Sequence, residues 1–127
     1  MNINYILLTN GNKLFSFFVH DYNSCETGEF IDGGFEYTRY NGNLQKGKID
    51  DLIGDIREQF VWGKNYDKDN NLLPKTQFIK LKDLDTDHII NILRYFTKES
   101  TNSNTWRSIH YIFLTELYYR ENYKIQS

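Results

Sequence analysis

The spacing of apolar residues changes at Ile49, and this change divides the 127-residue chain into two kinds of predicted structure. Before Ile49, short runs rich in aromatic and β-branched residues are typical of strands. The four runs lie at 3–9, 13–20, 28–32 and 35–40. After Ile49, apolar residues recur every three or four positions, which predicts amphipathic helices. We therefore expect an α+β fold, with an antiparallel sheet built mainly from the N-terminal half and C-terminal helices packed on one side.

Glycines beside Asn or Asp separate the predicted strands. The Asn-Gly pair at 10–11 lies between two β-prone runs, which is the strongest short-range signal for a hairpin. The Asp-Gly-Gly sequence at 32–34 predicts a second turn, because glycine readily adopts positive φ angles. The Asn-Gly-Asn sequence at 41–43 predicts a third turn that closes this part of the chain. Within the strand expected at 35–40, alternation predicts that Arg39 shares a face with two aromatic residues, Phe35 and Tyr37.

Three helices are predicted from the periodic spacing. The first spans 50–62, and the last runs from about Thr105 to Tyr123. Between them, Asp85 or Thr86 caps a helix that the polar sequence from Ser100 to Asn104 ends.

The segment between the first two helices is predicted to contain a polar loop over 63–74 and a strand over 75–82. No repeat or long linker divides the chain. Residues 1–127 are therefore expected to form a single domain.

Charge and cysteine content narrow the classes of function. A net charge of −2 gives no overall field to attract nucleic acid or an anionic membrane. The single Cys25 excludes an internal disulfide, and no Cys/His set has the spacing of a zinc site. The apolar run at 3–8 is too short to cross a bilayer and lacks the features of a signal peptide. We expect a cytoplasmic protein with no metal, no cofactor, and neither nucleic acid nor membrane as a partner.

Catalytic combinations are few. The adjacent His20 and Asp21 are a His/carboxylate pair of the kind used in acid–base catalysis, although a His at a strand end is more often structural. His88 lies in the first turn of a predicted helix, where the helix dipole does not favour a cation. Cys25 has no activating partner in the sequence. We therefore predict that the chain has no catalytic residues and is a binding protein, not an enzyme.

Arginine and the aromatic residues provide the candidate binding groups. The chain has ten Tyr, nine Phe and two Trp, a composition that suits a core, a subunit interface or a ring-stacking pocket. Arg39 lies between Tyr37 and Tyr40, and Arg120 follows Tyr118-Tyr119. A guanidinium beside aromatic rings can donate two hydrogen bonds to one phosphate while a nucleobase stacks on an adjacent ring. The alternative is that each Arg packs over a ring and pairs with a surface carboxylate.

The segment 19–39 resembles a signature found in small phage-encoded proteins. The signature combines a His-Asp-aromatic step, a Cys, a Gly, an Asp-Gly-Gly sequence and an aromatic residue shortly before an Arg. The likeness continues at Ile56-Arg57, at Trp62-Gly63, over 79–88 and in the sequence from Glu116 to Arg120. On this basis the chain resembles the first type of Thoeris anti-defence protein. Members of that family often carry Cys-x-Cys-Gly, whereas here Cys25 is followed by Glu-Thr-Gly.

This resemblance implies a sponge that binds a cyclic ADP-ribose isomer in the host cytoplasm and does not degrade it. Arg39 and Arg120 would then form a phosphate clamp, with Tyr37 and Tyr119 as stacking partners and Arg57 as a third cation. Asp32 is expected to shape the turn that presents Arg39 more than to touch the ligand.

A site closed between subunits would slow the release of such a ligand, so a homo-oligomer, a dimer or higher, is expected. Its contact is predicted on the apolar stripe of the last helix, which consists of Trp106, Ile109, Phe113 and Leu117. Two alternatives stay open: a module that inhibits a host defence protein directly, and a small hydrolase that uses His20 with Asp21.

Overall fold

The computed structural model describes residues 1–99 and 104–123, and the side chains of residues 96–106 lie outside the description. The strands are β1 (Asn2–Leu7), β2 (Lys13–Phe15), β3 (Tyr22–Ser24), β4 (Phe30–Asp32), β5 (Arg39–Asn41), β6 (Asn43–Lys48), β7 (Val61–Tyr66) and β8 (Leu72–Lys80). The helices are η1 (Ile49–Leu52), α1 (Ile53–Gln59), η2 (Leu81–Asp83), α2 (Thr86–Glu99) and α3 (Asn104–Tyr123).

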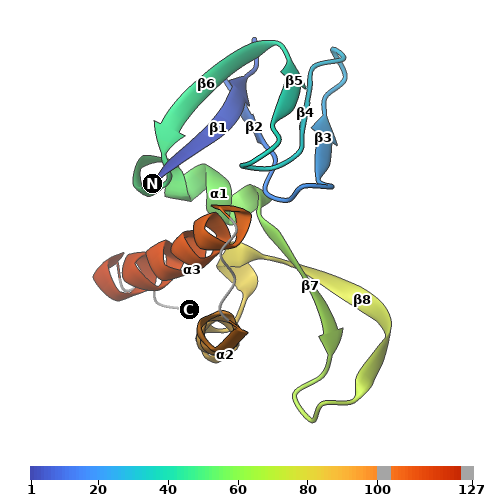
Figure 1. Cartoon of the computed structure of the whole chain (residues 1–127), viewed down its shortest axis with the longest axis vertical. Helices are drawn as coiled ribbons and strands as arrows, with labels where there is room; N and C mark the ends of the chain where they lie inside the picture. The colour runs from blue at the N-terminus through green and yellow to red at the C-terminus, as the bar shows by residue number, and fades with distance from the viewer. Residues whose placement is uncertain (100–103, 124–127) are drawn as a thin grey trace.

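The first six strands form two small antiparallel sheets at one end of the molecule (Figure 1). Strand β1 lies between β2 and β6, with Tyr5 opposite Phe15 on one side and opposite Gln45 on the other. Strand β4 lies between β3 and β5. The β1–β2 hairpin turns at Gly11, whose φ of 88° is the conformation predicted for it. The α+β class predicted from the sequence is therefore confirmed.

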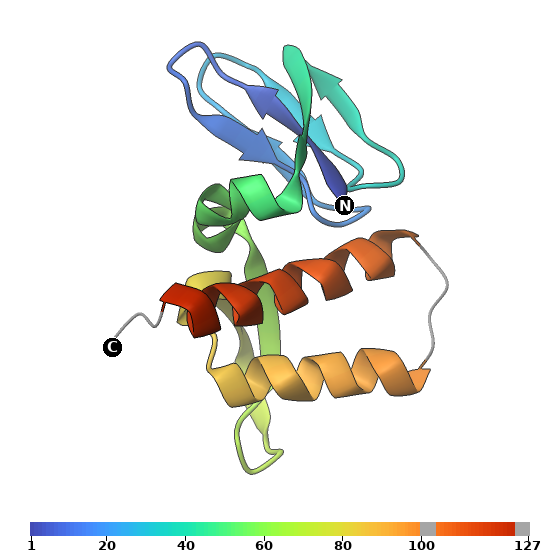
Figure 2. The same cartoon turned by 90° about the vertical axis from the view of Figure 1, so that its left-hand side faces the viewer.

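The helices lie together on one side of these sheets. In Figure 2, α1 lies directly beneath the strands, and α3 and then α2 follow, roughly parallel to each other. Strands β7 and β8 form a long hairpin that leaves the body of the molecule beside the helices (Figure 1). No helix in the described residues is both long enough and apolar enough to span a membrane.

One aromatic core joins the sheets to the helices. Phe60, at the end of α1, contacts Phe17 from the strand region and Phe113 from α3, both edge to face, with ring centroids 5.1 and 5.5 Å apart. Trp62 contacts the same Phe113 ring, with centroids 5.4 Å apart. Edge-to-face pairs are a preferred arrangement of buried rings. Much of the aromatic content of the chain therefore fills the core.

The strand predicted over 35–40 is wrong in its first half. Gly33 and Gly34 have φ values of 86° and 65°, and the chain then forms a turn closed by the hydrogen bond that Tyr37 N donates to Gly33 O. A Cβ atom at position 33 would lie 1.9 Å from Tyr37 O. Only glycine fits there. Phe35 and Tyr37 therefore belong to the turn and do not share a strand face with Arg39.

Three other sequence boundaries are corrected by the structure. The residues after Gly42 form β6, which pairs along β1, so the Asn-Gly-Asn turn does not end the sheet. The predicted loop at 63–74 contains most of β7 and the start of β8, and the helix predicted over 50–62 is divided into η1 and the short α1. β3 was not predicted at all. β3 and β6 consist mostly of polar residues, so a pattern of apolar residues does not reveal them.

Helices α2 and α3 are confirmed at the predicted positions. The break predicted from Ser100 to Asn104 falls on residues 100–103, which lie outside the described residues, and Asn104 already belongs to α3. The side chain of Trp106, predicted for the apolar stripe of the last helix, also lies outside the description.

Candidate functional site

The predicted binding residues fall into two groups in different parts of the molecule. Arg57, Tyr119 and Arg120 lie between α1, α3 and the start of α2. Asp32 and Arg39 face each other on the β3–β4–β5 sheet, and Tyr37 lies in the turn just before β5.

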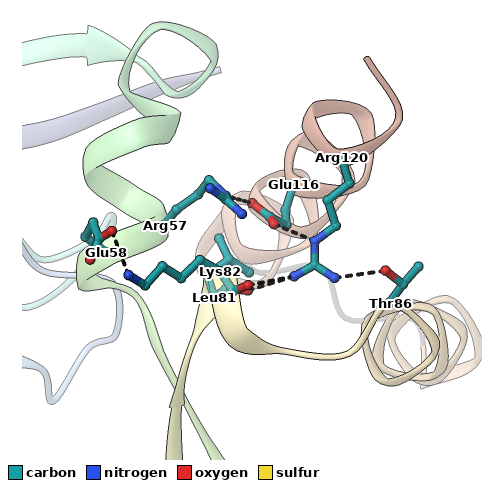
Figure 3. Close-up of polar contacts among 7 residues, drawn as sticks. All are labelled: Arg57, Glu58, Leu81, Lys82, Thr86, Glu116 and Arg120. Atoms are coloured by element: carbon teal, nitrogen blue, oxygen red, sulfur yellow. Dashed lines mark hydrogen bonds and ion pairs between the residues drawn. The ribbon is translucent and has the colours of Figure 1, made fainter. Parts of the chain in front are cut away.

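Glu116 is the centre of the first group. Its carboxylate is fully buried and accepts a hydrogen bond at 2.7 Å from Arg57 Nε of α1 and one at 2.6 Å from Arg120 Nε of its own helix. Figure 3 shows the two guanidinium groups approaching the two carboxylate oxygens from different sides. Two cations share one anion here, so the cluster carries a net positive charge. A buried carboxylate requires such partners, because an unpaired charge in the interior is very unfavourable.

Arg120 uses all three of its nitrogens within the protein. Besides the bond to Glu116, its Nη1 donates to Thr86 Oγ1 at 2.9 Å and its Nη2 donates to the carbonyl oxygen of Leu81 at 3.0 Å. These contacts connect α3 to η2 and to the first residue of α2 (Figure 3). Arg120 therefore holds the helices together, and its guanidinium is not open to a phosphate in this structure.

Arg57 is used less completely. Within the described residues only its Nε has a hydrogen-bond partner, which is Glu116. Its guanidinium carbon lies 4.4 Å from the centre of the Tyr119 ring, which is a cation–π contact. No buried side-chain nitrogen or oxygen in the described part of the chain lacks a partner, so the two terminal nitrogens of Arg57 reach solvent.

Tyr119 is also part of the wall of a surface pocket of about 470 Å³. The pocket lies where α3 runs past η1 and the start of α1. Four tyrosines contribute to its lining, together with aliphatic and polar residues. The full set is Asp50, Ile53, Tyr111, Leu114, Thr115, Tyr118, Tyr119 and Tyr123. We call this the tyrosine pocket.

The two ends of the tyrosine pocket differ in charge. At one end, Tyr111 donates its hydroxyl hydrogen to Asp50 at 2.7 Å, and this bond raises the pKa of Tyr111 above its ordinary value. At the other end, the rings of Tyr119 and Tyr123 lie 4.6 Å apart, with Arg57 against Tyr119. The eight residues from Tyr111 to Tyr119 correspond to about 12 Å of helix. The pocket therefore has a carboxylate at one end and a guanidinium beside the other.

Arg39 is in a much more exposed position. Its Nε and Nη2 donate to the two oxygens of Asp32 at 2.8 and 3.1 Å, and its side chain remains 78% exposed. The Asp-Gly-Gly turn places Asp32 directly opposite Arg39 in the sheet register. Asp32 thus orients Arg39, as the sequence suggested, and at the same time occupies one edge of its guanidinium.

The structure does not bring Arg39 and Arg120 together within one chain. They have no partner in common, since Arg39 is paired with Asp32 on the sheets and Arg120 with Glu116 between the helices. Tyr37 and Tyr119 are separated in the same way. Arg57 and Tyr119 are the two predicted ligand-binding residues that the structure brings into contact beside a pocket.

His20 and Asp21 lie beside a second pocket, of about 510 Å³, with Trp62 and Phe78 in its wall. Asp21 Oδ2 accepts the backbone N–H of Phe17 at 2.8 Å, so the carboxylate holds the turn after β2. Burial raises the pKa of Asp21, while the bond from Phe17 acts in the opposite direction. The contacts of Asp21 are those of a turn-stabilising residue.

Cys25 is a free thiol whose neighbours are hydroxyl and carboxylate groups. Its Sγ lies 3.1 Å from Thr27 Oγ1 and 3.9 Å from Glu29 Oε1. Neither of these two neighbours is a cationic group. Across residues 1–99 and 104–123, no three His, Cys, Asp or Glu side chains are grouped to hold a metal ion.

Sequence reasoning missed Glu116 and Asp50. The spacing of Glu116 and Arg120 is that of an i,i+4 helix pair, which is the one signal that pointed to this contact. The partnership with Arg57 spans 59 residues, and no local pattern shows it. Asp50 was placed at the start of a helix, with no indication that it would border a pocket.

Comparison with known proteins adds no relative. The chain matches no family model, no curated protein and no solved structure.

Proposed function

We propose that this chain is a phage anti-defence protein that binds a cyclic ADP-ribose-type signal and sequesters it without degrading it. The observation that supports the proposal is the tyrosine pocket. Its volume of about 470 Å³ lies within the range of about 300–1,000 Å³ that is usual for small-molecule sites. Its lining combines flat rings with a few polar groups, which is the composition expected of a site for a purine-containing ligand.

Tyrosine suits this task for a physical reason. Its ring stacks on a base without the entropy loss of a long flexible side chain, and its hydroxyl group stays hydrated or bonds to a sugar. Tyr118 is 69% exposed and Tyr123 is 68% exposed, so both rings are accessible at the rim of the pocket. A ligand that covered them would gain apolar contact and ring stacking at the same time.

A second copy of the chain would close the site. Leu114, 47% exposed, and Tyr118 lie on the outer side of α3, and a partner placed on them would cover the pocket. A closed pocket releases its ligand slowly, which a sponge requires in order to keep a signal away from its receptor. We therefore propose a homo-oligomer, in the cytoplasm of the host cell, whose contacts lie on this outer side of α3. The stripe predicted from the sequence does not provide them, because Ile109 and Phe113 are fully buried in the core of the chain.

The proposed protein acts by binding alone. The lining of the tyrosine pocket offers hydroxyl groups and one carboxylate, that of Asp50, which already accepts the hydroxyl hydrogen of Tyr111. Hydrolysis of a pyrophosphate or glycosidic bond requires a base or an acid positioned at the scissile bond. The ligand is therefore expected to leave the protein unchanged.

The same exposed α3 surface favours a second candidate, a module that binds a host defence protein directly. Exposed apolar and aromatic residues on one helix are typical of helix-mediated contacts between proteins. Such a module would need no small molecule.

Ligand recovery separates these functions. The purified chain is incubated with a cyclic ADP-ribose isomer, passed through a desalting column and denatured by heat, and the supernatant is analysed by mass spectrometry. A sponge releases the intact ligand, and a melting temperature that rises with ligand concentration accompanies binding. Linearised or cleaved product would instead indicate a hydrolase. Absence of ligand after desalting, together with an unchanged melting temperature, would contradict the proposed function.

A matched pair of tyrosine variants locates the site. Tyr118→Ala removes an exposed ring of the pocket and should weaken binding by about 1–3 kcal/mol, the range for loss of one base–aromatic stack. Tyr40→Ala removes an exposed ring of β5, outside the pocket, and should leave binding unchanged. The reverse result would move the site to the sheets.

A further inference from the structure

We infer that the terminal nitrogens of Arg57 are the anion-binding part of the tyrosine pocket, so that its ligands carry a phosphate next to the ring that stacks there. The inference rests on the proposed function, because it assigns a ligand chemistry to the same pocket. It differs from the two-arginine clamp predicted from the sequence, because the structure directs both Arg39 and Arg120 to other partners.

The first argument is the charge imbalance around Glu116. Two guanidinium groups, 15% and 19% exposed, share one fully buried carboxylate. The nearby Glu58 does not cancel the excess charge, because it pairs with Lys82 at 2.9 Å and with Lys80 at 3.7 Å. A partly buried positive charge attracts an anion more strongly than a hydrated surface cation does, because little water screens it.

The second argument is which nitrogens remain open. Each nitrogen of Arg120 has a hydrogen-bond partner within the protein, whereas only Nε of Arg57 has one, and neither terminal nitrogen of Arg57 is fully buried. Glu116 and the Tyr119 ring fix the plane of the Arg57 guanidinium, so little further entropy is lost when an anion binds. Two parallel N–H groups match two oxygens of a phosphate.

The third argument is position. Arg57 lies one helical turn after Ile53, which lines the tyrosine pocket, and its guanidinium packs against the Tyr119 ring of the same pocket. A ring stacked near Tyr119 or Tyr123 would bring an attached phosphate to Arg57. Asp50 lies at the opposite end, where its carboxylate repels the phosphate and can accept a hydrogen bond from an amino or hydroxyl group of the ligand. The pocket therefore favours one orientation of a nucleotide.

Adenosine and adenosine 5′-monophosphate are suitable probes, because they differ only in the phosphate. Titration calorimetry on the wild-type chain should show that the monophosphate binds about 10-fold to 100-fold more tightly, the value of a charge-assisted hydrogen-bonded contact. In Arg57→Gln this preference should disappear, so that the monophosphate binds about as tightly as adenosine, while the affinity for adenosine stays the same. Glu116 keeps Arg120 as a partner in this variant, so the fold is expected to survive.

Two matched variants act as controls. Arg39→Gln removes the same charge from the sheet surface and should leave the preference intact. Asp50→Asn removes the carboxylate that repels the phosphate from the opposite end, so it should keep or strengthen the preference for the monophosphate. A preference that persists in Arg57→Gln, or that collapses in Arg39→Gln or Asp50→Asn, would overturn the inference.

A measurement on the wild-type chain alone covers the case in which Arg57→Gln does not fold. Added salt should weaken binding of the monophosphate and leave adenosine binding nearly unchanged. Equal salt dependence for the two probes would overturn the inference. If the wild-type chain binds both probes with equal affinity, the assignment of Arg57 as the anion-binding group fails, while the proposal of a ligand site at the tyrosine pocket is retained. If it binds neither of them nor a cyclic ADP-ribose isomer, the proposed function itself fails.

Discussion

Two arginine–carboxylate clusters of this protein have similar chemistry and opposite surroundings. Around Glu116, two guanidinium groups share a carboxylate that no solvent reaches. On the β3–β4–β5 sheet, Arg39 and Asp32 form a bidentate pair in which the arginine is almost entirely in water. Because water screens exposed charges, we expect burial, more than the geometry of the contact, to decide what each pair contributes to stability.

The consequence for function follows from the number of partners. Arg39 balances one charge with one charge, and water stabilises both of them. The Glu116 cluster contains two cations and one anion. One of the cations, Arg57, is held beside the tyrosine pocket by its contact with the Tyr119 ring. The buried cluster thus has both a structural role, through Arg120, and an open binding group, through Arg57.

The largest expected effect is that of Glu116→Ala. Both arginines would then lose their shared partner while remaining mostly out of water, so the free energy of unfolding should fall by about 3–5 kcal/mol. Urea denaturation followed by circular dichroism measures this loss. Glu121→Ala, an exposed position on the same helix, is the control and should change stability by less than about 0.5 kcal/mol. A loss of that small size for Glu116→Ala would mean that the cluster is not buried as described.

An intermediate effect separates Arg120 from Arg39. Arg120→Ala removes bonds to Glu116, Thr86 and Leu81 and should cost about 1.5–3 kcal/mol of stability. Arg39→Ala breaks a solvent-exposed pair and should cost about 0–1 kcal/mol. The two variants can be measured side by side by thermal and urea unfolding. Equal losses would break the comparison, because burial would then not distinguish the two clusters.

The smallest effect concerns Asp21, a half-buried carboxyl that has no cationic partner among the described residues. Burial raises its pKa in the folded state above the ordinary value of 3.8, so folding opposes its ionisation. The stability that this carboxyl contributes is therefore complete below about pH 3.8 and is lost as the pH rises through the folded-state pKa.

Asp21→Asn keeps an oxygen for the N–H of Phe17 and cannot ionise. The stability of this variant relative to the wild-type chain should therefore increase as the pH rises from about 3.5 to 7. Unfolding curves across this range test the sign. A relative stability that decreases with pH would show that folding favours the ionised form of Asp21, which contradicts the prediction.

The fold could be predicted where local chemistry determines it. The Asn-Gly pair at 10–11 specifies the β1–β2 hairpin, and the apolar periodicity specifies α2 and α3. Strand β6 was missed because it carries few apolar residues and is defined by pairing with β1. Strand β7 was missed because Val61 and Trp62 were included in the predicted helix and the remaining residues in the predicted loop. The turn predicted at the two glycines extends through Tyr37, and residues 35–37 were mistaken for strand because their aromatic side chains have high β propensity.

The candidate site was predicted in part. Arg57 and Tyr119 were named from residue type and resemblance, and the structure places them in contact. Their common neighbour Glu116 and the facing Asp50 were not identified, since each becomes relevant only when α1, η1 and α3 pack together. Arg39 and Arg120 are not brought together within one chain, and a sequence does not show which carboxylate each arginine will bind.

The most direct test of the account is to map where a nucleotide binds by NMR. The chain is labelled with ¹⁵N and titrated with ADP-ribose, and the amide chemical-shift changes are assigned to residues. We predict that the largest changes fall on η1, α1 and the half of α3 that carries Tyr111, Tyr118 and Tyr119. Changes concentrated around Tyr37, Arg39 and the β3–β4–β5 sheet would contradict the account and place the binding site at the exposed arginine instead.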